Sequence, residues 1–457
     1  MLKKLFAPTD MTLGSPWKSI VIFTLPMLLG NIAQQLYSTV DSIVVGKYIG
    51  DNALAAVGSA TPIVNMLLVL FIGISAGASI MVAQYFGARK RDELSHTIGN
   101  CITVTAIACL LLIMVATPVI RPALVALNTP ETILDDCCDY LVISLWGIAG
   151  MAYYNILSGI IRGLGDSVSA LIYLLVATVI NTVLDVYFVA SLNMGVAGAA
   201  LATIIAQIVS SILCFIKLSK MTEFFDFGTK YLKPVGSYVK TLVKLGIPSG
   251  LTQAIFSSAM IIVQSLTNQF GEQFIAANVV TMRVDGFAMM PNFSFGTALT
   301  TYAGQNVGAG LYDRVTKGAK QGTLIAVGCS TVITLAILLF GKNLMGFFTD
   351  TAELVERSYF LMKILAVGYI AVAVTQSLSG IMRGAGDTMT PMWISLITTV
   401  AIRVPLAYGI SFLTRSPENP LGISECIQIS LLSSWVIGAV LTTIFYSRGK
   451  WKNKAIN

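Results

Sequence analysis

Charge is scarce in this sequence of 457 residues, and the shortage decides its broad class. Asp, Glu, Lys and Arg make up 11% of the residues, hydrophobic types make up 55%, and the mean hydropathy is +0.79. A soluble domain has about a quarter of its residues charged. The composition therefore predicts an integral membrane protein rather than a soluble one.

The sequence also has very little histidine, and its cysteines form no recognisable motif. His96 is the single histidine, which we expect in a basic loop, so histidine metal sites and catalytic triads are excluded. The cysteines show no metal-ligand spacing and are expected to be small core residues. They are Cys101, Cys109, Cys137, Cys138, Cys214, Cys329 and Cys426. Because no catalytic group is visible, we expect no enzymatic activity and no cofactor.

Nucleotide-binding motifs are missing as well. The chain has no Gly-x-x-x-x-Gly-Lys-Ser/Thr sequence and no ATPase domain. Any energy-requiring process carried out by this chain would therefore draw on an ion gradient rather than on ATP. A nucleic-acid partner has no motif behind it either, although the net charge is +7.

Long apolar runs, by contrast, occur twelve times. Each is roughly 20 residues or longer, enough to cross a hydrocarbon core of about 30 Å. None shows the period-two alternation of barrel strands, so we predict helices. The runs are 17–45, 53–84, 98–120, 138–161, 168–190, 195–217, 240–266, 275–304, 318–340, 359–381, 391–413 and 427–447.

The chain contains two copies of one module, 221 positions apart. Gly159, Arg162, Gly163, Gly165 and Asp166 recur as Gly380, Arg383, Gly384, Gly386 and Asp387. Six apolar runs in each copy mean that both copies enter the membrane in the same direction, as parallel repeats do. We predict an all-α membrane protein of twelve helices in two six-helix lobes. The N-lobe is 1–217, the inter-lobe linker 218–239 and the C-lobe 240–457.

The basic residues set the expected orientation. With the twelve predicted helices in place, 21 of the 29 Lys and Arg residues lie on one side of the membrane. They fall at the N-terminus, in alternate loops, in the linker and in the C-terminal tail. Lys and Arg accumulate on the cytoplasmic side of membrane proteins. We therefore expect a multi-pass protein of the cytoplasmic membrane, with both termini inside the cell. Lys3 and Lys4 are followed by an apolar run too long for a cleavable signal peptide.

Few ionisable residues lie inside the predicted helices, where each costs at least about 2.5–3.5 kcal/mol. They are Asp41, Asp185, Arg283, Asp285 and Arg403. Both N-lobe charges are acidic. Arg283 either extends to the membrane surface or has a functional role. Arg403 either pairs with an acid or faces a cavity, and the sequence does not choose between these readings.

Both acids of the N-lobe have polar neighbours. Gln34, Ser38 and Asp41 share one helical face, and so do Asn181 and Asp185. Asn155 and Thr203 can approach the same depth. These oxygen donors suit Na⁺, while two carboxylates in a dry site repel each other until one binds a proton. A cation-coupling site is our interpretation, and interhelical hydrogen bonding is the structural alternative.

Two further features concern backbone geometry. The repeated Arg-Gly-x-Gly-Asp turn is expected to be structural, with Asp166 and Asp387 capping the helices that follow. Pro26 and Pro248 occupy near-equivalent positions and each removes a helical hydrogen bond. A protonation-dependent bend at Pro26 and a static kink are equally consistent with the sequence.

In these features the chain resembles the multidrug and toxic compound extrusion (MATE) family, specifically its DinF-like branch. The resemblance covers almost the full chain. It rests on the six-plus-six duplication, on Pro26 followed by Gln34, Tyr37 and Asp41, and on Gln84-x-x-Gly87-Ala88. Arg162-Gly163-Leu164-Gly165-Asp166 and the pair Asn181 and Asp185 complete it.

The resemblance implies a secondary active multidrug exporter that exchanges H⁺ or Na⁺ for organic, cationic, amphipathic compounds by alternating access. The cation site implied for DinF-like members matches Asp41, Asn155, Asn181, Asp185 and Thr203, and no metal beyond Na⁺ is expected. A substrate cavity would include Gln34, Tyr37, Met282, Arg283, Phe287 and Met290, although core packing explains the Met and Phe residues equally. The expected partners are drug-like small molecules and the lipid bilayer, and we expect a monomer. The alternative is a flippase or exporter of a lipid-linked or other dedicated metabolite.

Overall fold

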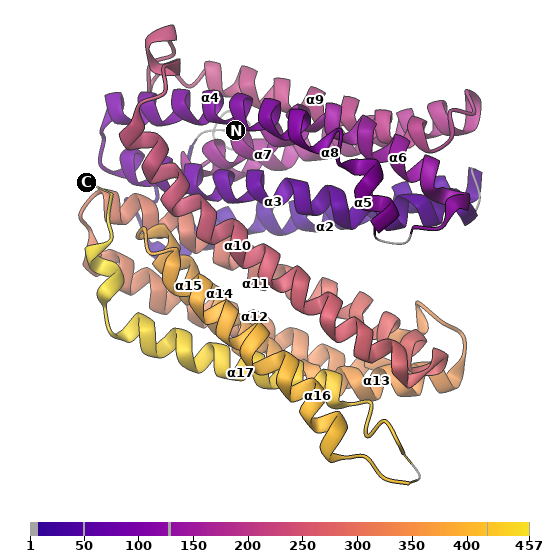
Figure 1. Cartoon of the computed structure of the whole chain (residues 1–457). Coiled ribbons are helices and arrows are strands. Elements are labelled where there is room, and N and C mark those ends of the chain that lie inside the picture. The colour runs from indigo at the N-terminus through magenta and orange to yellow at the C-terminus, as the bar shows by residue number, and fades with distance from the viewer. Residues whose placement is uncertain (1–7, 49–50, 127–128, 418, 457) are drawn as a thin grey trace. The chain divides into compact units, whose positions relative to one another are not determined.

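The computed structural model describes residues 8–48, 51–126, 129–417 and 419–456 (Figure 1). Side chains are described for these residues except 36–48, 51–56, 58, 59 and 62. Within the described part of the chain every regular element is a helix, which confirms the all-α prediction.

The first half of the chain forms ten helical segments. They are α2 (Pro16–Tyr48), α3 (Asp51–Gly87), α4 (Arg91–Ala116), α5 (Ile120–Ala126), α6 (Glu131–Trp146), α7 (Ile148–Gly163), α8 (Ser167–Asp185), η1 (Val186–Ser191), α9 (Gly195–Ser219) and η2 (Thr229–Leu232). Pro26 lies inside α2, which continues through it as one helix.

The second half repeats this pattern. Its segments are α10 (Gly236–Thr267), η3 (Asn268–Phe270), α11 (Glu272–Gly308), α12 (Tyr312–Gly346), α13 (Ala352–Ala366), α14 (Gly368–Gly384), α15 (Met389–Ser395), η4 (Leu396–Arg403), α16 (Val404–Leu413), α17 (Cys426–Ser447) and η5 (Lys450–Asn453). Pro248 lies inside α10, as Pro26 does in α2.

Helices long enough to cross a membrane account for most of the chain. In its described part nine single helices are long and apolar enough, and two bent pairs, α6 with α7 and α13 with α14, raise the number to eleven. The pairs bend by 49° and 45°. The helix α11 is also long enough to span, and it carries Arg283 and Asp285. It completes the predicted set of twelve.

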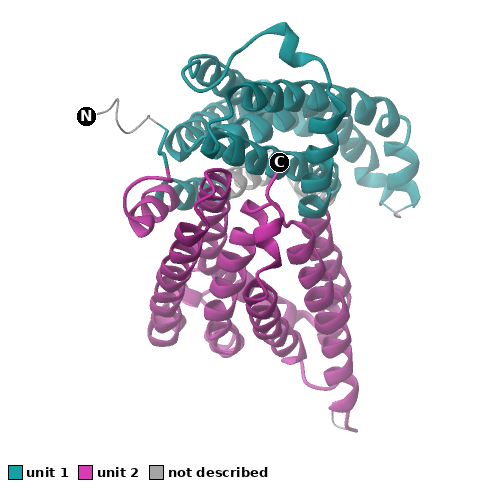
Figure 2. Ribbon diagram, turned by 90° about the vertical axis from the view of Figure 1, so that its left-hand side faces the viewer, with its two compact units in different colours: residues 1–10, 25–250 teal, residues 11–24, 251–457 magenta. Residues whose placement is uncertain are grey.

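Contacts divide the chain into two compact units (Figure 2). The first unit comprises Met1–Asp10 and Leu25–Gly250, and the second comprises Met11–Thr24 and Leu251–Asn457. The boundaries fall inside α2 and α10, one or two residues from Pro26 and Pro248. The predicted lobes, 1–217 and 240–457, follow the repeat rather than these contacts, and they remain a prediction.

Each unit has its own apolar core. In the first unit Phe71, Leu141 and Ala152 are buried together. In the second unit Ile337, Met362 and Leu365 are buried together. Burial of a large apolar side chain stabilises a fold by about 1.5–3 kcal/mol in water. In a bilayer that driving force between helices is weaker, so close packing of small residues contributes more.

The duplication is visible at the level of single contacts. A β-carbon added at Gly159 would collide with Ser75, and one added at Gly380 would collide with Gly296. One turn further on, Gly163 lies against Ser79 and Gly384 against Thr300. Each contact in the second unit is the first-unit contact moved by 221 residues. Glycine is needed at these positions because two helix backbones touch there.

Both Arg-Gly-x-Gly-Asp turns cap the next helix, as predicted. Asp166 accepts a hydrogen bond from the backbone N–H of Ser169 at 2.9 Å, and Asp387 accepts one from the N–H of Thr390 at 3.2 Å. Gly165 and Gly386 have φ values of +94° and +97°, which a side chain rarely tolerates. The turns are therefore structural.

Candidate functional site

The buried polar group of the first unit is built on α8. Asn181 and Asp185 are 1% and 0% exposed and lie one turn apart near the end of this helix. The helix continues directly into the π-helical segment η1. Such segments are rare and frequently occur at functional sites. The sequence placed these two side chains on one face, and the structure buries both.

Thr203 from α9 joins this group. The side-chain amide of Asn181 donates a hydrogen bond to the hydroxyl oxygen of Thr203 at 3.3 Å. The side-chain oxygen of Asn181 is the atom of this amide that can bind a cation. Of the predicted cation-site residues, the structure thus brings Asn181 and Thr203 into contact, and Asp185 lies one turn from Asn181 on the same helix.

Asn155 is held differently. Its side-chain nitrogen donates to the backbone carbonyl of Met151 on its own helix α7, at 2.8 Å. Its backbone carbonyl accepts a hydrogen bond from the Ser75 hydroxyl at 2.6 Å. The helix α7 packs against α8 and α9, so Asn155 lies on a neighbouring helix without a hydrogen bond to Asn181.

The remaining predicted residues of α2 are less defined. The side chains of Tyr37 and Asp41 lie outside the described residues, although both positions belong to α2. Gln34 is described and its side chain is exposed. Pro26 lies near the start of this helix, about four turns before Asp41.

A second polar group occupies the interior of the second unit. The Tyr369 hydroxyl donates to Oδ1 of Asp285 at 2.9 Å, and Nε of Arg403 donates to the Ser434 hydroxyl at 3.1 Å. Tyr369 begins α14 just after the bend at Val367, and Arg403 ends the π-helical segment η4. The sequence identified Asp285 and Arg403 as costly charges, but gave no role to Tyr369 or Ser434. The length of an apolar run, from which the helices were predicted, carries no signal for a π segment or a bend.

The predicted substrate residues of α11 lie on two faces of that helix. Arg283 is exposed and Phe287 is 41% exposed, one turn further along. Met290 is 8% exposed, and Met282 packs against the buried cluster around Val284 and Met362. Arg283 and Phe287 are accordingly the members of this set best placed to meet a ligand.

The linker between α9 and α10 is docked on α4. Arg91 donates to the backbone carbonyls of Thr222 and Glu223, each at 2.7 Å, and to the Asp226 carboxylate at 2.8 Å. The hydrogen bond from Arg91 holds the pKa of Asp226 below its ordinary value. A cation beside a carboxylate favours its charged form.

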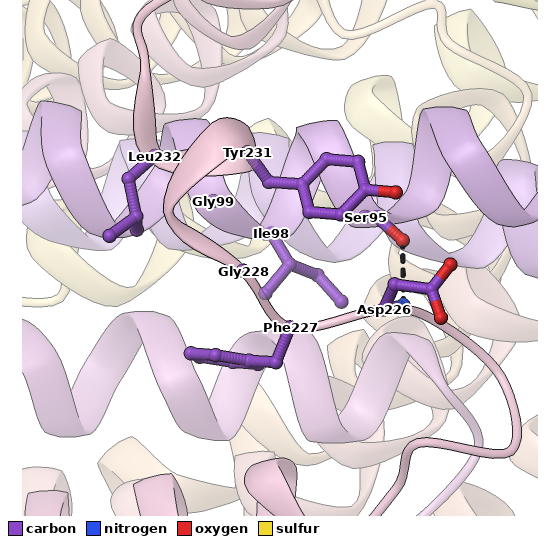
Figure 3. Close-up of a pocket in the computed structure, with 8 residues that line it drawn as sticks. All are labelled: Ser95, Ile98, Gly99, Asp226, Phe227, Gly228, Tyr231 and Leu232. Atoms are coloured by element: carbon purple, nitrogen blue, oxygen red, sulfur yellow. Dashed lines mark hydrogen bonds between the residues drawn. The ribbon is translucent and has the colours of Figure 1, made fainter.

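A small pocket marks this docked segment, between α4 and the linker (Figure 3). It is lined by Ser95, Ile98, Gly99, Asp226, Phe227, Gly228, Tyr231 and Leu232. The backbone N–H of Asp226 donates to the Ser95 hydroxyl at 2.8 Å, and Tyr231 donates to Asp92 at 3.2 Å. The polar groups here hold the linker in place, so we assign the pocket a structural role.

His96 lies beside this pocket, and its predicted position was wrong. It is on α4 rather than in a loop, because α4 begins at Arg91 instead of residue 98. Its ring stacks on Tyr238 at 5.4 Å and meets Tyr231 edge-on at 4.8 Å. Among the described residues no group of three or more His, Cys, Asp and Glu side chains could hold a metal ion.

Up to eleven candidate spans among the described residues, an internal repeat and buried polar groups in both units are typical of a duplicated membrane transporter. The family model MatE matches the chain twice, over residues 26–188 and 248–409. The two matches begin at Pro26 and Pro248 and together cover most of the chain. The chain therefore belongs to the MatE family, whose members are transporters rather than enzymes.

Named relatives and solved structures agree with this assignment. The chain is 27% identical to "Probable multidrug resistance protein YoeA" of Bacillus subtilis, over 97% of this chain and 96% of that protein. It is 25% identical to "Probable multidrug resistance protein NorM" of Thermotoga maritima, over 96% and 94%. A crystal structure of MATE in the bent conformation has a TM-score of 0.89 at 22% identity, with 97% of this chain and 98% of that chain covered. This structural likeness establishes the fold.

Proposed function

We propose that the protein is a secondary active multidrug exporter of the cytoplasmic membrane, driven by H⁺ or Na⁺ and related to the DinF-like branch. The observation that carries the proposal is the burial of Asp185 and Asn181 beside a π-helical segment, with the Asn181 amide hydrogen-bonded to Thr203. Two relatives that match nearly the whole chain have names that refer to multidrug resistance. No cofactor is needed for such antiport.

The chemistry of the site explains why it would take a cation. An acid in a membrane interior costs at least about 2.5–3.5 kcal/mol unless its charge is compensated. Na⁺ would be compensated by the carboxylate and amide oxygens, and H⁺ would neutralise one carboxylate. Asp41, the other acid within the predicted N-lobe helices, would supply the second carboxylate. Asn155 on α7 would contribute an amide oxygen.

Cation entry is coupled to substrate export if the cation and the substrate compete for binding in the same lobe. A ligand shifts a conformational equilibrium only when it binds the two states with different affinity. Binding of the cation from outside would displace an amphipathic organic cation, and release of the cation inside would reset the site. Pro26, where a hydrogen bond of α2 is missing, is where we place a bend of that helix. Arg283, Phe287, Met282, Met290, Gln34 and Tyr37 are the proposed substrate contacts.

The proposal is tested by ethidium efflux from cells that express Asp185→Asn or Asp41→Asn. Asparagine keeps the shape of aspartate but removes the charge that binds the cation. Coupled efflux should fall to the level of cells without the protein, while the purified variants remain monodisperse. Asp135→Asn, which alters an exposed acid paired with Arg121, is the matched control and should retain efflux. Efflux at the wild-type rate by either site variant contradicts the proposal.

Orientation belongs to the same proposal. The distribution of Lys and Arg favours a cytoplasmic position for both termini. A green fluorescent protein fused after the last residue should fold and fluoresce, because it folds in the bacterial cytoplasm. Absence of fluorescence from a correctly inserted full-length fusion would reverse the orientation.

A further inference from the structure

The first half of α10 carries two lysines without an acidic partner in the described part of the chain. Lys240 and Lys244 are the only Asp, Glu, Lys or Arg residues of the candidate span Gly236–Phe270. Both are exposed, and neither side chain makes an ion pair or a hydrogen bond with any residue that the structure describes. They lie one turn apart, where like charges repel each other and lower helix stability. Contacts within the fold therefore do not explain them.

The two lysines begin an exposed stripe of α10 that becomes apolar within one turn. Lys240, Lys244 and Ile247 follow the i, i+4, i+7 spacing of one helical face, and Val243 lies beside them. Val243 is 39% exposed and Ile247 is 50% exposed. On the opposite side of the helix, a β-carbon added at Gly246 would lie 2.9 Å from a backbone oxygen of α3. The stripe therefore points away from α3, toward the outside of the first unit.

The length of the span places the lysines at a membrane surface. Gly236–Phe270 has 35 residues. At a rise of about 1.5 Å per residue it is about 52 Å long, whereas the hydrocarbon core is about 30 Å thick. Its ends therefore extend into the headgroup regions. We expect Lys240 and Lys244, in the first turns, to lie among lipid headgroups, and Val243 and Ile247 to meet the start of the acyl chains.

The chain just before α10 is fixed on α4, so the start of the stripe has an ordered support. Asn100 donates to the Lys233 carbonyl at 3.4 Å and accepts a hydrogen bond from the N–H of Val235 at 2.7 Å. Thr103 donates to the Leu232 carbonyl at 2.7 Å, where the linker runs along α4 (Figure 3). The Lys233 side chain is exposed and adds a third positive charge close to the helix start. A support that is ordered before a ligand arrives loses less entropy on binding.

The equivalent helix of the other repeat carries only one of the two lysines. At the offset of 222 residues that relates the two helix prolines, Lys240 corresponds to Lys18 and Lys244 corresponds to Ile22. Ile22 is 59% exposed, so this position faces outward in both helices. The duplicated scaffold thus accepts an apolar residue there. The second lysine of α10 is a feature of this helix alone.

We propose that this surface, the α10 stripe, binds an anionic phospholipid. The stripe consists of Lys233, Lys240, Val243, Lys244 and Ile247. Its ammonium groups bind the phosphate oxygens of the headgroup, and its apolar part contacts the acyl chains. A lysine near an anionic membrane surface strengthens binding about fivefold. A zwitterionic headgroup gains less, because its own cation offsets the phosphate. The inference does not depend on the proposed export function.

Native mass spectrometry of the purified full-length protein tests the stripe. Titration with phosphatidylglycerol and, separately, with phosphatidylcholine of the same acyl chains gives the Kd of the first bound lipid. Lys240→Gln/Lys244→Gln should weaken phosphatidylglycerol binding about tenfold or more and leave phosphatidylcholine binding unchanged. Lys240→Arg/Lys244→Arg keeps both charges and should retain the wild-type Kd. An unchanged Kd for phosphatidylglycerol in the glutamine variant overturns the inference.

A matched control distinguishes a lipid site from a general effect of positive charge. Lys450→Gln/Lys452→Gln removes the same charge from two exposed lysines of η5 and should bind phosphatidylglycerol as the wild type does. Equal weakening in the two glutamine variants would show that the lipid responds to net charge alone, which contradicts the inference. All these substitutions change exposed side chains, so each variant should keep the wild-type unfolding temperature.

The same measurement separates this inference from the proposed function. Asp185→Asn, which should abolish coupled efflux, should bind phosphatidylglycerol with the wild-type Kd. Lys240→Gln/Lys244→Gln should lose lipid binding whether or not the protein exports ethidium. Loss of phosphatidylglycerol binding in Asp185→Asn would place the lipid away from the α10 stripe and overturn the inference.

Discussion

Asp185 and Arg403 are an acidic and a basic residue on equivalent helices of the two repeats. Each is buried and each adjoins a π-helical segment, η1 after Asp185 and η4 ending at Arg403. A π segment shifts the register of a helix, so it can aim a side chain that regular α-helical geometry would not. The two π segments do not coincide in the repeat, because η4 corresponds to residues 175–182 of α8, so the equivalent helices differ in local backbone as well as in side-chain chemistry.

We predict that Arg91 stabilises the fold by holding the linker against α4, on the face that we propose to be cytoplasmic. Arg91→Gln removes the hydrogen bonds that hold Thr222, Glu223 and Asp226 against α4, so we expect a lower unfolding temperature at pH 7. The folded-state pKa of Asp226 is depressed, so its contribution is present above its unfolded pKa of about 4 and disappears as the pH falls through the folded value. The difference between wild type and variant should therefore narrow below about pH 4.

The hydrogen bonds from Arg91 to backbone carbonyl groups do not depend on pH. The difference in unfolding temperature between wild type and Arg91→Gln should therefore narrow at low pH without vanishing. Thermal unfolding followed by tryptophan fluorescence across pH measures it. Arg121→Gln, which breaks the exposed Arg121–Asp135 pair, serves as control and should change stability little. A wild-type-to-Arg91→Gln difference that is constant with pH would contradict the assigned role of Asp226.

Helices in each unit meet along seams of small residues. In the first unit Gly73 and Gly77 of α3 face Gly246 and Gly250 of α10, and a β-carbon added at Gly73 would lie 2.6 Å from the Gly246 carbonyl oxygen. Both pairs have the Gly-x-x-x-Gly spacing of close helix contacts. These seams fix the helices that carry the polar groups.

Gly384→Ala tests the seam between α11 and α14. The added carbon would collide with the Thr300 carbonyl oxygen and lie 2.8 Å from Ala303 Cβ, so one helix must move. Overpacking of this kind costs about 1–3 kcal/mol. Gly328→Ala is the control, since nothing lies within 4 Å of its added carbon. Equal unfolding temperatures for the two variants would show that the seam does not limit stability.

The sequence was sufficient to predict the elements that follow from periodicity and turn chemistry. Hydropathy marked the spans, and the Arg-Gly-x-Gly-Asp turns predicted the caps at Asp166 and Asp387. The bends at Gly147 and Val367 were missed because apolar runs pass through them unchanged. The docking of the linker on α4 was missed too, since Arg91 binds mainly backbone carbonyls, which every residue carries.

The candidate sites divide in the same way. Asn181 and Asp185 were predictable because they lie on one helix at a fixed spacing. The contact of Thr203 with Asn181 was anticipated only from the family resemblance and from the similar depth of the two residues in the membrane. Tyr369 and Ser434 could not be assigned, because their roles depend on which helices pack together rather than on local sequence.

At the scale of the whole molecule, duplication gives two units with a shared scaffold and different charges. The two family matches, the paired glycine seams and the paired turns all repeat at nearly the same offset. The proposed function assigns the coupling cation to the acidic group of the first unit.

The most direct measurement is ethidium transport into proteoliposomes under an imposed pH gradient or an imposed Na⁺ gradient. Wild type, Asp41→Asn and Asp185→Asn are compared side by side. The account predicts that one gradient drives wild-type transport and that neither gradient drives transport by the two variants. Transport by Asp185→Asn at the wild-type rate would contradict it. Absence of wild-type transport under both gradients would contradict the coupling proposal as well, and would favour export of a lipid-linked or dedicated metabolite.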